Sequence, residues 1–376
     1  MGFQGSRVFG YWWIDGFVLS GLIMEVSRLL TVVVILLGGG IFLSPSGLFA
    51  EPISVTDFRG KQITLEKPAD RVICLLESAL SGLYMLGAEE RLVGISTNIY
   101  QESVFAYYAA MDERIRSKSL ATPGNWDFVN IESVVALQPD LVIIWSGQEE
   151  SIQSMEEKGI PVYGVFIERF EDIHREIEAL GKLTGTEGRA EELVRMVREE
   201  LDTVRERIVG KEKSGVSGVK KPRVYFMWAQ GTLETSGRNS TVQELIELAG
   251  GVNVAAGIEQ EHLVANLENI LVWNPEVIVM WCNDRMDPVD VERLPSWRSV
   301  AAIKNGRVRE FPDPFSCDFW TLKYLFSVEM VARWCHPERF EKVELESLRS
   351  DLLGKLYGGK LGSTLPSLEA EEGVKP

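Results

Sequence analysis

Residues that could ligate a metal or act as nucleophiles are few in this 376-residue sequence and lie far apart. The histidines are His174, His262 and His336, and the cysteines are Cys74, Cys282, Cys317 and Cys335. No Cys-x-x-Cys pair occurs, so the pattern favours neither a zinc site nor a disulfide scaffold. Scattered histidines also argue against a bare transition metal held by several imidazoles. Tyrosine or carboxylate ligation of ferric ion, and a pairing among the last three cysteines, stay open.

Motifs that signal catalysis are also missing. The chain has no Gly-x-Gly-x-x-Gly opening a helix, no Walker loop, no Gly-x-Ser-x-Gly elbow and no His-Glu-x-x-His. A Ser/His/Asp triad would have to draw on the same separated histidines. Lys and Arg number 39 against 55 Asp and Glu, a net charge of −16 with no basic stripe, which disfavours a nucleic-acid partner. The sequence therefore predicts a binding protein rather than an enzyme.

The clearest pattern in the sequence is a repeat of sixteen residues. Residues 130–145 (NIESVVALQPDLVIIW) align without a gap with residues 266–281 (NLENILVWNPEVIVMW), at an offset of 136. Each copy predicts a short helix capped by Asn130 or Asn266, a proline turn, and a continuous apolar strand. Strands that are apolar on both faces are typical of parallel sheets covered by helices.

The repeat predicts an α/β fold of two pseudo-symmetric Rossmann-like lobes with mainly parallel sheets. We expect the lobes at about 51–184 and 222–345, a connecting helix and linker at 185–221, and a tail at 346–376. Apolar residues at 193, 197, 201, 204 and 208 form one stripe on an otherwise charged segment from about Glu187 to Ile208. This pattern predicts one long rigid helix between the lobes.

Residues 1–50 are typical of a secretory signal rather than of a folded domain. An apolar run from Leu29 to Leu43 follows Arg28 and precedes small residues that end at Ala50, where we expect cleavage. Met24 would give a signal of normal length and is an alternative start. An uncleaved membrane anchor is the other alternative. In both cases the body of the protein is expected in the periplasm or on the extracytoplasmic face.

Aromatic residues fall at the predicted strand ends, where open α/β sheets bind ligands. Trp145 and Trp281 occupy equivalent places at the ends of the two repeats, and further aromatic residues lie on other predicted loops, namely Tyr100, Trp126, Trp228 and Trp320. Two lobes facing each other would put these side chains on a shared cleft suited to a flat or ring-bearing ligand. The alternative is that each tryptophan caps the core of its own lobe.

Several segments, in order, resemble one protein family. They are residues 55–61 (VTDFRGK), 71–73 (RVI), 86–88 (LGA) with 92–94 (LVG), 159–162 (GIPV), 248–253 (LAGGVN), 300–308 (VAAIKNGRV) and the two repeats. Together they resemble the extracytoplasmic solute-binding proteins of ABC importers for ferric siderophores, haem and cobalamin, from about Val55 to Phe340. The resemblance implies two lobes on a single helix, a ligand held between them, no intrinsic cofactor and no catalysis.

The resemblance also implies roles for particular residues. Glu132 and Glu268, one in each repeat, match the positions that meet arginines of the membrane permease dimer; the alternative is that each only complements its helix dipole. Further ligand contacts implied on loops are Trp126, Arg238, Arg285, Phe315 and Trp320. An arginine there could clamp an anionic chelate.

The sequence therefore predicts a monomeric binding protein that captures a ferric siderophore or similar metal chelate and delivers it to an ABC permease dimer with its ATPase. A cobalamin or haem binding protein of the same type is one alternative. An extracytoplasmic sensor or a metallochaperone on the same fold is the alternative from another class.

Overall fold

The computed structural model describes residues 51–361, apart from 102–103, 211–219, 284 and 341–343. The predicted signal at 1–50 and most of the predicted linker lie outside the described residues. The first lobe and the connecting helix contain β1 (Ile53–Thr56), β2 (Gln62–Leu65), β3 (Val72–Cys74), α2 (Glu77–Leu86), η1 (Glu89–Arg91), β4 (Leu92–Ser96), η2 (Thr97–Tyr100), α3 (Phe105–Met111), α4 (Glu113–Arg116), β5 (Ala121–Gly124), α5 (Ile131–Ala136), β6 (Leu141–Trp145), α6 (Glu149–Glu156), β7 (Val162–Val165), α7 (Phe170–Thr184) and α8 (Glu187–Val209).

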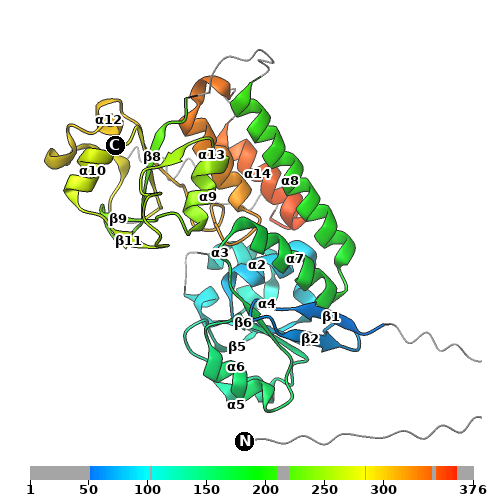
Figure 1. Cartoon of the computed structure of the whole chain (residues 1–376). Coiled ribbons are helices and arrows are strands. Elements are labelled where there is room, and N and C mark those ends of the chain that lie inside the picture. The colour runs from blue at the N-terminus through cyan, green and yellow to red at the C-terminus, as the bar shows by residue number, and fades with distance from the viewer. Residues whose placement is uncertain (1–50, 102–103, 211–219, 284, 341–343, 362–376) are drawn as a thin grey trace, which may run out of the picture. The chain divides into compact units, whose positions relative to one another are not determined.

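The second lobe follows the helix α8 (Figure 1). Its elements are β8 (Arg223–Met227), β9 (Glu234–Thr235), α9 (Thr241–Leu248), β10 (Val252–Asn253), β11 (Leu263–Val264), α10 (Leu267–Trp273), β12 (Val277–Met280), α11 (Pro288–Glu292), η3 (Pro295–Trp297), α12 (Ala301–Lys304), β13 (Val308–Glu310), α13 (Tyr324–Cys335), η4 (Pro337–Arg339) and α14 (Leu345–Tyr357). None of the described helices is both long enough and apolar enough to span a membrane.

Each lobe is built on a parallel sheet, as the apolar strands predict. The first sheet has the order β5-β4-β3-β6-β7 and the second β10-β8-β12-β13, with every pairing parallel. In the first sheet the chain adds β4 and β5 on one side of β3 and then adds β6 and β7 on the other side. In the second sheet it adds β10 on one side of β8 and then β12 and β13 on the other. The switch points therefore lie between β3 and β6 and between β8 and β12, the places where such sheets bind ligands.

The two copies of the repeat fold alike. Asn130 caps α5 by accepting a hydrogen bond from the Ser133 amide at 2.9 Å, and Asn266 caps α10 by accepting one from the Asn269 amide at 2.8 Å. Residues Gln138 and Asn274, again 136 apart, leave the two helices with φ of 47° and 43°. The predicted caps, turns and strands of both repeats are confirmed.

Arginines just before β3 and at the start of β8, the first strands of the two parallel sheets, close the repeated helices. Arg71 donates from its guanidinium to the carbonyls of Leu137 and Gln138, at 2.6 and 3.0 Å. Arg223 donates in the same way to the carbonyl of Asn274, at 2.9 Å. These cations satisfy the carbonyls left open at helix ends, so each repeated helix is fixed at both termini.

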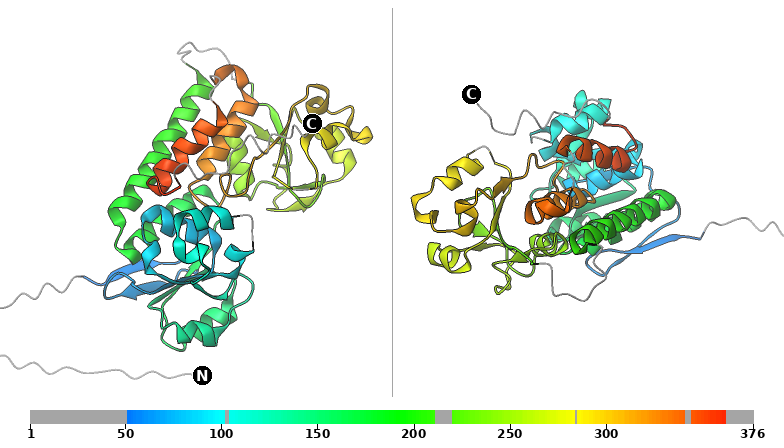
Figure 2. Two further views of the ribbon diagram at one scale, coloured as in Figure 1. Left: turned by 180° about the vertical axis from the view of Figure 1, so that it is seen from behind. Right: turned by 90° about the horizontal axis from the view of Figure 1, so that it is seen from above.

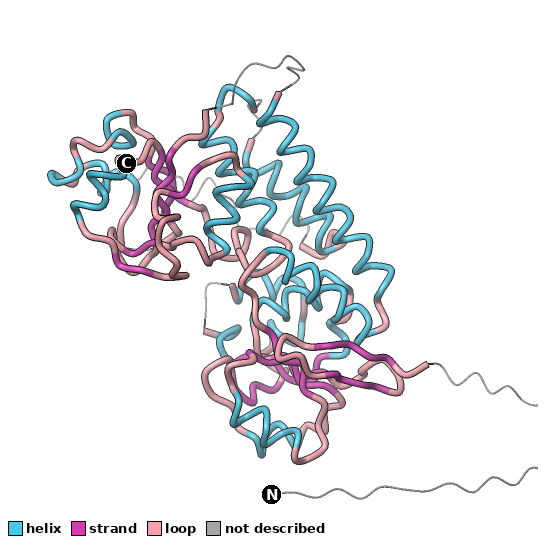
Figure 3. Tube along the Cα trace, viewed as in Figure 1, coloured by secondary structure: helices cyan, strands magenta, loops and turns pink. Residues whose placement is uncertain are grey.

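The helix α8 carries the predicted apolar stripe. Leu193, Val197, Val204 and Ile208 are buried and Leu201 is half-buried. They join one continuous core that also takes side chains from one face of each sheet and from α2, α7, α13 and α14. The opposite sheet faces form two separate cores, one under α5 and α6 and one under α10 and α12. Figures 2 and 3 show α8 running beside α13 and α14.

The segment assigned to the tail, 346–376, begins with a packed helix. Residues Leu345–Tyr357 form α14, which packs on α2 and α13. Leu352, Leu353, Leu356 and Tyr357 are buried in the main core, and the Tyr357 hydroxyl shares a hydrogen bond of 2.6 Å with Ser81 of α2. Burial of this apolar face against α2 of the first lobe and α13 of the second stabilises the helix.

Candidate functional site

Three of the predicted ligand contacts, all tryptophans, lie together at the strand ends of the second lobe. They are Trp228, Trp281 and Trp320. The ring of Trp228 follows β8 and lies 5.6 Å from Trp281 and 6.3 Å from Trp320, centroid to centroid, the latter nearly parallel at 16°. Its indole nitrogen donates to the buried Ser236 hydroxyl at 2.8 Å. All three tryptophans are half-buried. They therefore form a pre-packed aromatic wall with part of each ring accessible.

His262 belongs to the same wall, although sequence reasoning gave it no role. Its ring stacks on Trp228 at 6.0 Å and 28°, and its Nε2 lies 2.9 Å from a Glu234 carboxylate oxygen. His262 is the exposed histidine, whereas His174 and His336 are buried and bonded to the Tyr324 hydroxyl and the Gly250 carbonyl. His262 comes close to Trp228 because β11 pairs with β9, and this pairing joins segments that are far apart in the sequence. No local sequence pattern could have predicted it.

The first lobe carries a smaller aromatic pair at its own strand ends. Trp145 ends β6, and Trp126 follows β5; their rings meet edge to face at 6.2 Å and 83°. Gln148 fixes the Trp126 loop by donating to the carbonyls of Trp126 and Asp127. Trp126 is 45% exposed. Gly147 lets the Trp145 ring lie close to the backbone, because a Cβ at that position would lie 2.7 Å from the ring.

The remaining predicted contacts lie in different surroundings. Tyr100 is half-buried and packs on Phe105 at 6.3 Å, with its hydroxyl donating to the Leu120 carbonyl. Arg238 is exposed, and its guanidinium donates to the Ala256 carbonyl and pairs with Glu259 at 3.0 Å. Arg285 is exposed on the loop that follows Trp281. These three residues are not brought into contact with either aromatic group by any described interaction.

Phe315 is the predicted contact that the structure buries. Its ring stacks on Tyr107 of α3 at 4.1 Å and 5°, and the Lys323 ammonium lies 3.9 Å above it. Only 1% of Phe315 is exposed. The residue therefore ties the second lobe to the first, and we leave it out of the proposed ligand surface.

Charged groups are buried or half-buried where the two lobes join. Lys323 lies 3.6 Å from the Asp318 carboxylate and is 1% exposed. Burial lowers the pKa of Lys323 and raises the pKa of Asp318, although each partner opposes the shift of the other. Burial also raises the pKa of Glu77, which accepts a hydrogen bond of 2.6 Å from Ser96 at the end of β4. Asp318 accepts from the Trp320 amide, so this group positions the aromatic wall.

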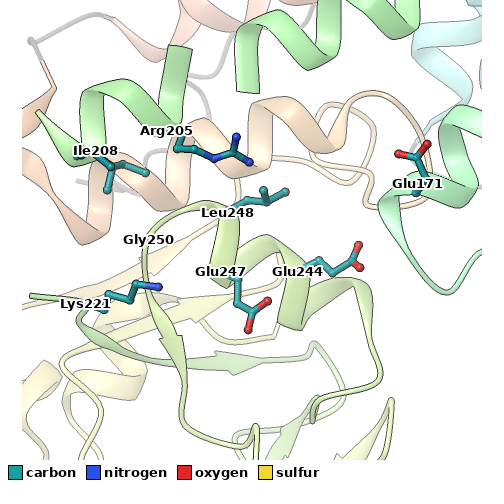
Figure 4. Close-up of a pocket in the computed structure, with 9 residues that line it drawn as sticks. Glu171, Arg205, Ile208, Lys221, Glu244, Glu247, Leu248 and Gly250 are labelled. Atoms are coloured by element: carbon teal, nitrogen blue, oxygen red, sulfur yellow. The ribbon is translucent and has the colours of Figure 1, made fainter. Parts of the chain in front are cut away.

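The cavities described beside α8 lie away from the strand ends. One, of about 460 Å³, is lined by α7, α8 and α9 and mixes acidic and basic side chains such as Glu244 and Arg205 (Figure 4). Another, of about 320 Å³, lies among α8, α13 and α14. Neither cavity is lined by a tryptophan. Among the described residues, no cluster of His, Cys, Asp and Glu could hold a metal ion.

The predicted docking residues lie on the outer faces of the two sheets. Glu132 and Glu268 are exposed in the first turns of α5 and α10, where a carboxylate also complements the helix dipole. Val134 and Ile270 anchor the opposite sides of these helices in the two outer cores. The structure thus presents one exposed carboxylate at an equivalent place on each lobe.

Known proteins resemble this chain over most of its length. A family described as periplasmic binding protein matches residues 72–314. The molybdate-binding protein MolA of Haemophilus influenzae is 25% identical over 81% of this chain and 90% of its own. The vitamin B12-binding protein of Vibrio parahaemolyticus is 24% identical over 64% and 81%. Among solved structures, a Ni-His complex of Helicobacter pylori CeuE aligns with a TM-score of 0.67 at 21% identity, covering 84% of this chain and all of CeuE.

Proposed function

This chain belongs to the periplasmic binding protein family and is a substrate-binding protein of an ABC importer, and we propose that its substrate is a ferric siderophore or a similar ring-bearing metal chelate. The observation that carries the proposal is the pair of aromatic groups at the strand ends, Trp126 with Trp145 and Trp228 with Trp281 and Trp320. Aromatic faces contribute large apolar contact with planar ligands.

Charge supports an anionic chelate. Arg238 and Arg285 are exposed cations on loops of the second lobe, the latter on the loop that follows Trp281, and a guanidinium recognises carboxylate or catecholate oxygens through paired hydrogen bonds. Arg238 is held by Glu259 on the surface, where an ion pair contributes only about 0–1 kcal/mol. A chelate oxygen could therefore replace Glu259 at small cost.

A cobalamin or haem ligand is the alternative within the same function, since both are flat macrocycles and one relative is a vitamin B12-binding protein. Molybdate, bound by MolA, is a four-oxygen anion that would leave most of this aromatic surface in water. A sensor or metallochaperone is the alternative from another class. It would bind a similar ligand without engaging a permease.

Ligand class is tested by quenching of intrinsic tryptophan fluorescence with ferric catecholates, ferric hydroxamates, haem, cobalamin and molybdate. We expect saturable quenching by the ferric chelates, weakened by Trp145→Ala and by Trp281→Ala. Trp273→Phe, in a half-buried tryptophan at the end of α10, is the matched control and should leave the affinity unchanged. Saturation by molybdate alone, or a flat response to all five, would contradict the proposed substrate.

We further propose that Glu132 and Glu268 bind arginines on the permease dimer. Two exposed carboxylates at equivalent places on pseudo-symmetric lobes suit a two-fold partner, because each can meet the same cationic site once. The double variant Glu132→Arg with Glu268→Arg should abolish binding to the reconstituted permease and ATPase while ligand affinity is kept. Reversal of Glu178 and Glu191, which are exposed on α7 and α8, is the control. Wild-type permease binding by the first variant would refute the docking role.

A further inference from the structure

Exposed apolar side chains recur at matching places around the two proposed docking glutamates. Phe128 is 66% exposed and Val264, 136 positions later, is 68% exposed. Val135 is 41% exposed and its counterpart Leu271 is 40% exposed. We call these four side chains the apolar docking residues. Few large apolar side chains in the described part of the chain are this exposed. Two pairs of them separated by 136 positions, the spacing of the repeat, therefore indicate a common surface rather than scattered exposure.

Helix geometry puts one apolar docking residue of each lobe beside its carboxylate. Val135 and Leu271 each follow the docking glutamate of their own helix by three positions, and side chains three apart are neighbours on one helical face. Phe128 and Val264 precede the helix caps Asn130 and Asn266 by two positions. Each lobe therefore presents a carboxylate with an apolar neighbour on its own helix and a second exposed apolar side chain just before the helix cap.

The backbone that carries Phe128 is held in place. Its amide donates to the Asn125 side chain at 2.8 Å, and its carbonyl approaches Gly124 so closely that a Cβ there would lie 2.2 Å from the oxygen. Val264 lies in β11, paired with β9. In both lobes, hydrogen-bonded backbone therefore holds exposed apolar side chains in fixed positions. A partner that binds them pays little for ordering this surface.

We propose that the apolar docking residues form, with Glu132 and Glu268, a two-part surface that binds the extracytoplasmic face of a two-fold-symmetric membrane permease. The partner would offer, on each half, an apolar recess next to a cationic side chain. The inference rests on the proposed function, because it takes the permease as the occupant. The repeat itself supplies the argument for that occupant, since the same pattern of apolar and acidic side chains recurs once on each lobe, as a partner with two equal halves requires.

The two halves are not equal. Val272 is 82% exposed beside Leu271, whereas its counterpart in the first lobe is the small Ala136. The second lobe therefore offers more apolar area at its half of the surface. Substitutions there should weaken binding more than the equivalent substitutions in the first lobe.

The test measures binding of the full-length purified protein to its permease–ATPase complex in lipid nanodiscs. The double variant Phe128→Ser with Val264→Ser, and the variant Val135→Ser with Leu271→Ser, should each bind at least about tenfold more weakly. The control is Val252→Ser with Val289→Ser, two residues of similar exposure elsewhere on the second lobe, which should bind as wild type. Unchanged thermal unfolding and unchanged fluorescence quenching by ferric catecholates should accompany the loss.

Each outcome separates this inference from the proposed function. Wild-type affinity in both serine variants, with binding lost when Glu132 and Glu268 are reversed, would overturn the apolar surface and leave the carboxylate docking standing. An equal loss in the control variant would also overturn it. Sedimentation that shows a wild-type dimer and a monomeric serine variant would assign the surface to a second copy of this chain instead. No nanodisc binding by the wild-type protein would overturn both.

Discussion

The two lobes agree on their outer faces and differ at their strand ends. On the outer faces, α5 and α10 share an asparagine cap, a residue with positive φ just after the helix, and a glutamate in the first turn. Their exposed apolar side chains also match. At the strand ends, the first lobe offers two tryptophans meeting edge to face, while the second packs three tryptophans, a phenylalanine and His262 into one wall. A surface that binds a symmetric partner is expected to carry the same side chains in both lobes, because each lobe meets the same partner site. Walls that enclose one asymmetric ligand need not be alike.

The lobes also bury charge differently, and the second lobe gives the largest expected effect. Lys323→Met leaves the half-buried Asp318 without its cation; breaking a fully buried pair costs about 3–5 kcal/mol, and the 20% exposure of the Asp318 side chain puts this loss at the lower end of that range. Urea unfolding should report a loss of that size. The double variant with Asp318→Asn should recover much of it, because the unpaired carboxylate is gone. Equal losses in the single and double variants would contradict a coupled pair.

The aromatic groups differ in how far the fold depends on them. Trp228 contacts Phe226, Trp281, Trp320 and Phe319, so Trp228→Ala should cost about 3 kcal/mol of unfolding free energy. Trp126→Ala, at a residue that is 45% exposed, should cost less than about 1 kcal/mol. Both should weaken chelate binding in the fluorescence assay. Similar stability losses in the two variants would show that the first-lobe pair is packed as firmly as the second-lobe wall.

The first lobe buries an acid without a cation. Burial raises the pKa of Glu176 to about 8, with Asp318 adding to the shift, and its Oε1 has no hydrogen-bond partner among the described groups. Between the pKa of the unfolded chain, near 4.5, and about 8, the folded state holds a proton that unfolding releases. Stability should therefore fall as pH rises through this window, by at most about 1.4 kcal/mol per pH unit.

Urea unfolding at pH 5 and pH 8 measures this slope. Glu176→Gln keeps a neutral side chain at both values and should flatten it, whereas Glu178→Gln, exposed on the same helix, should not. Tyr163, Cys74 and Asp318 lie close enough to interact with Glu176 and stay unchanged in both variants. An unchanged slope in Glu176→Gln would assign the pH dependence to Asp318 or Glu77 instead.

Local patterns explain what the sequence predicted well. The caps at Asn130 and Asn266, the proline turns and the apolar strands all depend on residues within a few positions of one another, so the repeat determines them. Leu348, Leu352 and Leu356 step by four and could have revealed α14 in the same way. The aromatic residues at strand ends followed from the topology of parallel sheets.

Contacts between distant segments explain what could not be predicted. Phe315 was expected to face a ligand, yet Tyr107, more than 200 positions earlier, covers its ring. Arg238 and Glu259 pair across a loop, and His262 reaches Trp228 only because β9 and β11 meet. Each of these depends on the docking of segments, which no local periodicity encodes.

The smallest expected effect lies at Gly147, where the first-lobe pair is most easily disturbed. Ala at this position must displace the Trp145 ring, which would otherwise meet the new Cβ at 2.7 Å, and so change its contact with Trp126. Because this pair is less packed than the second-lobe wall, we expect stability to change by less than about 1 kcal/mol and chelate affinity to fall only a few-fold. Near-ultraviolet circular dichroism should report the altered tryptophan pair. Gly188→Ala on α8, where the added Cβ meets nothing within 4 Å, should leave the spectrum and the affinity alone. If Gly147→Ala did the same, the edge-to-face pair would not be part of the ligand surface, and the second lobe alone would hold the chelate.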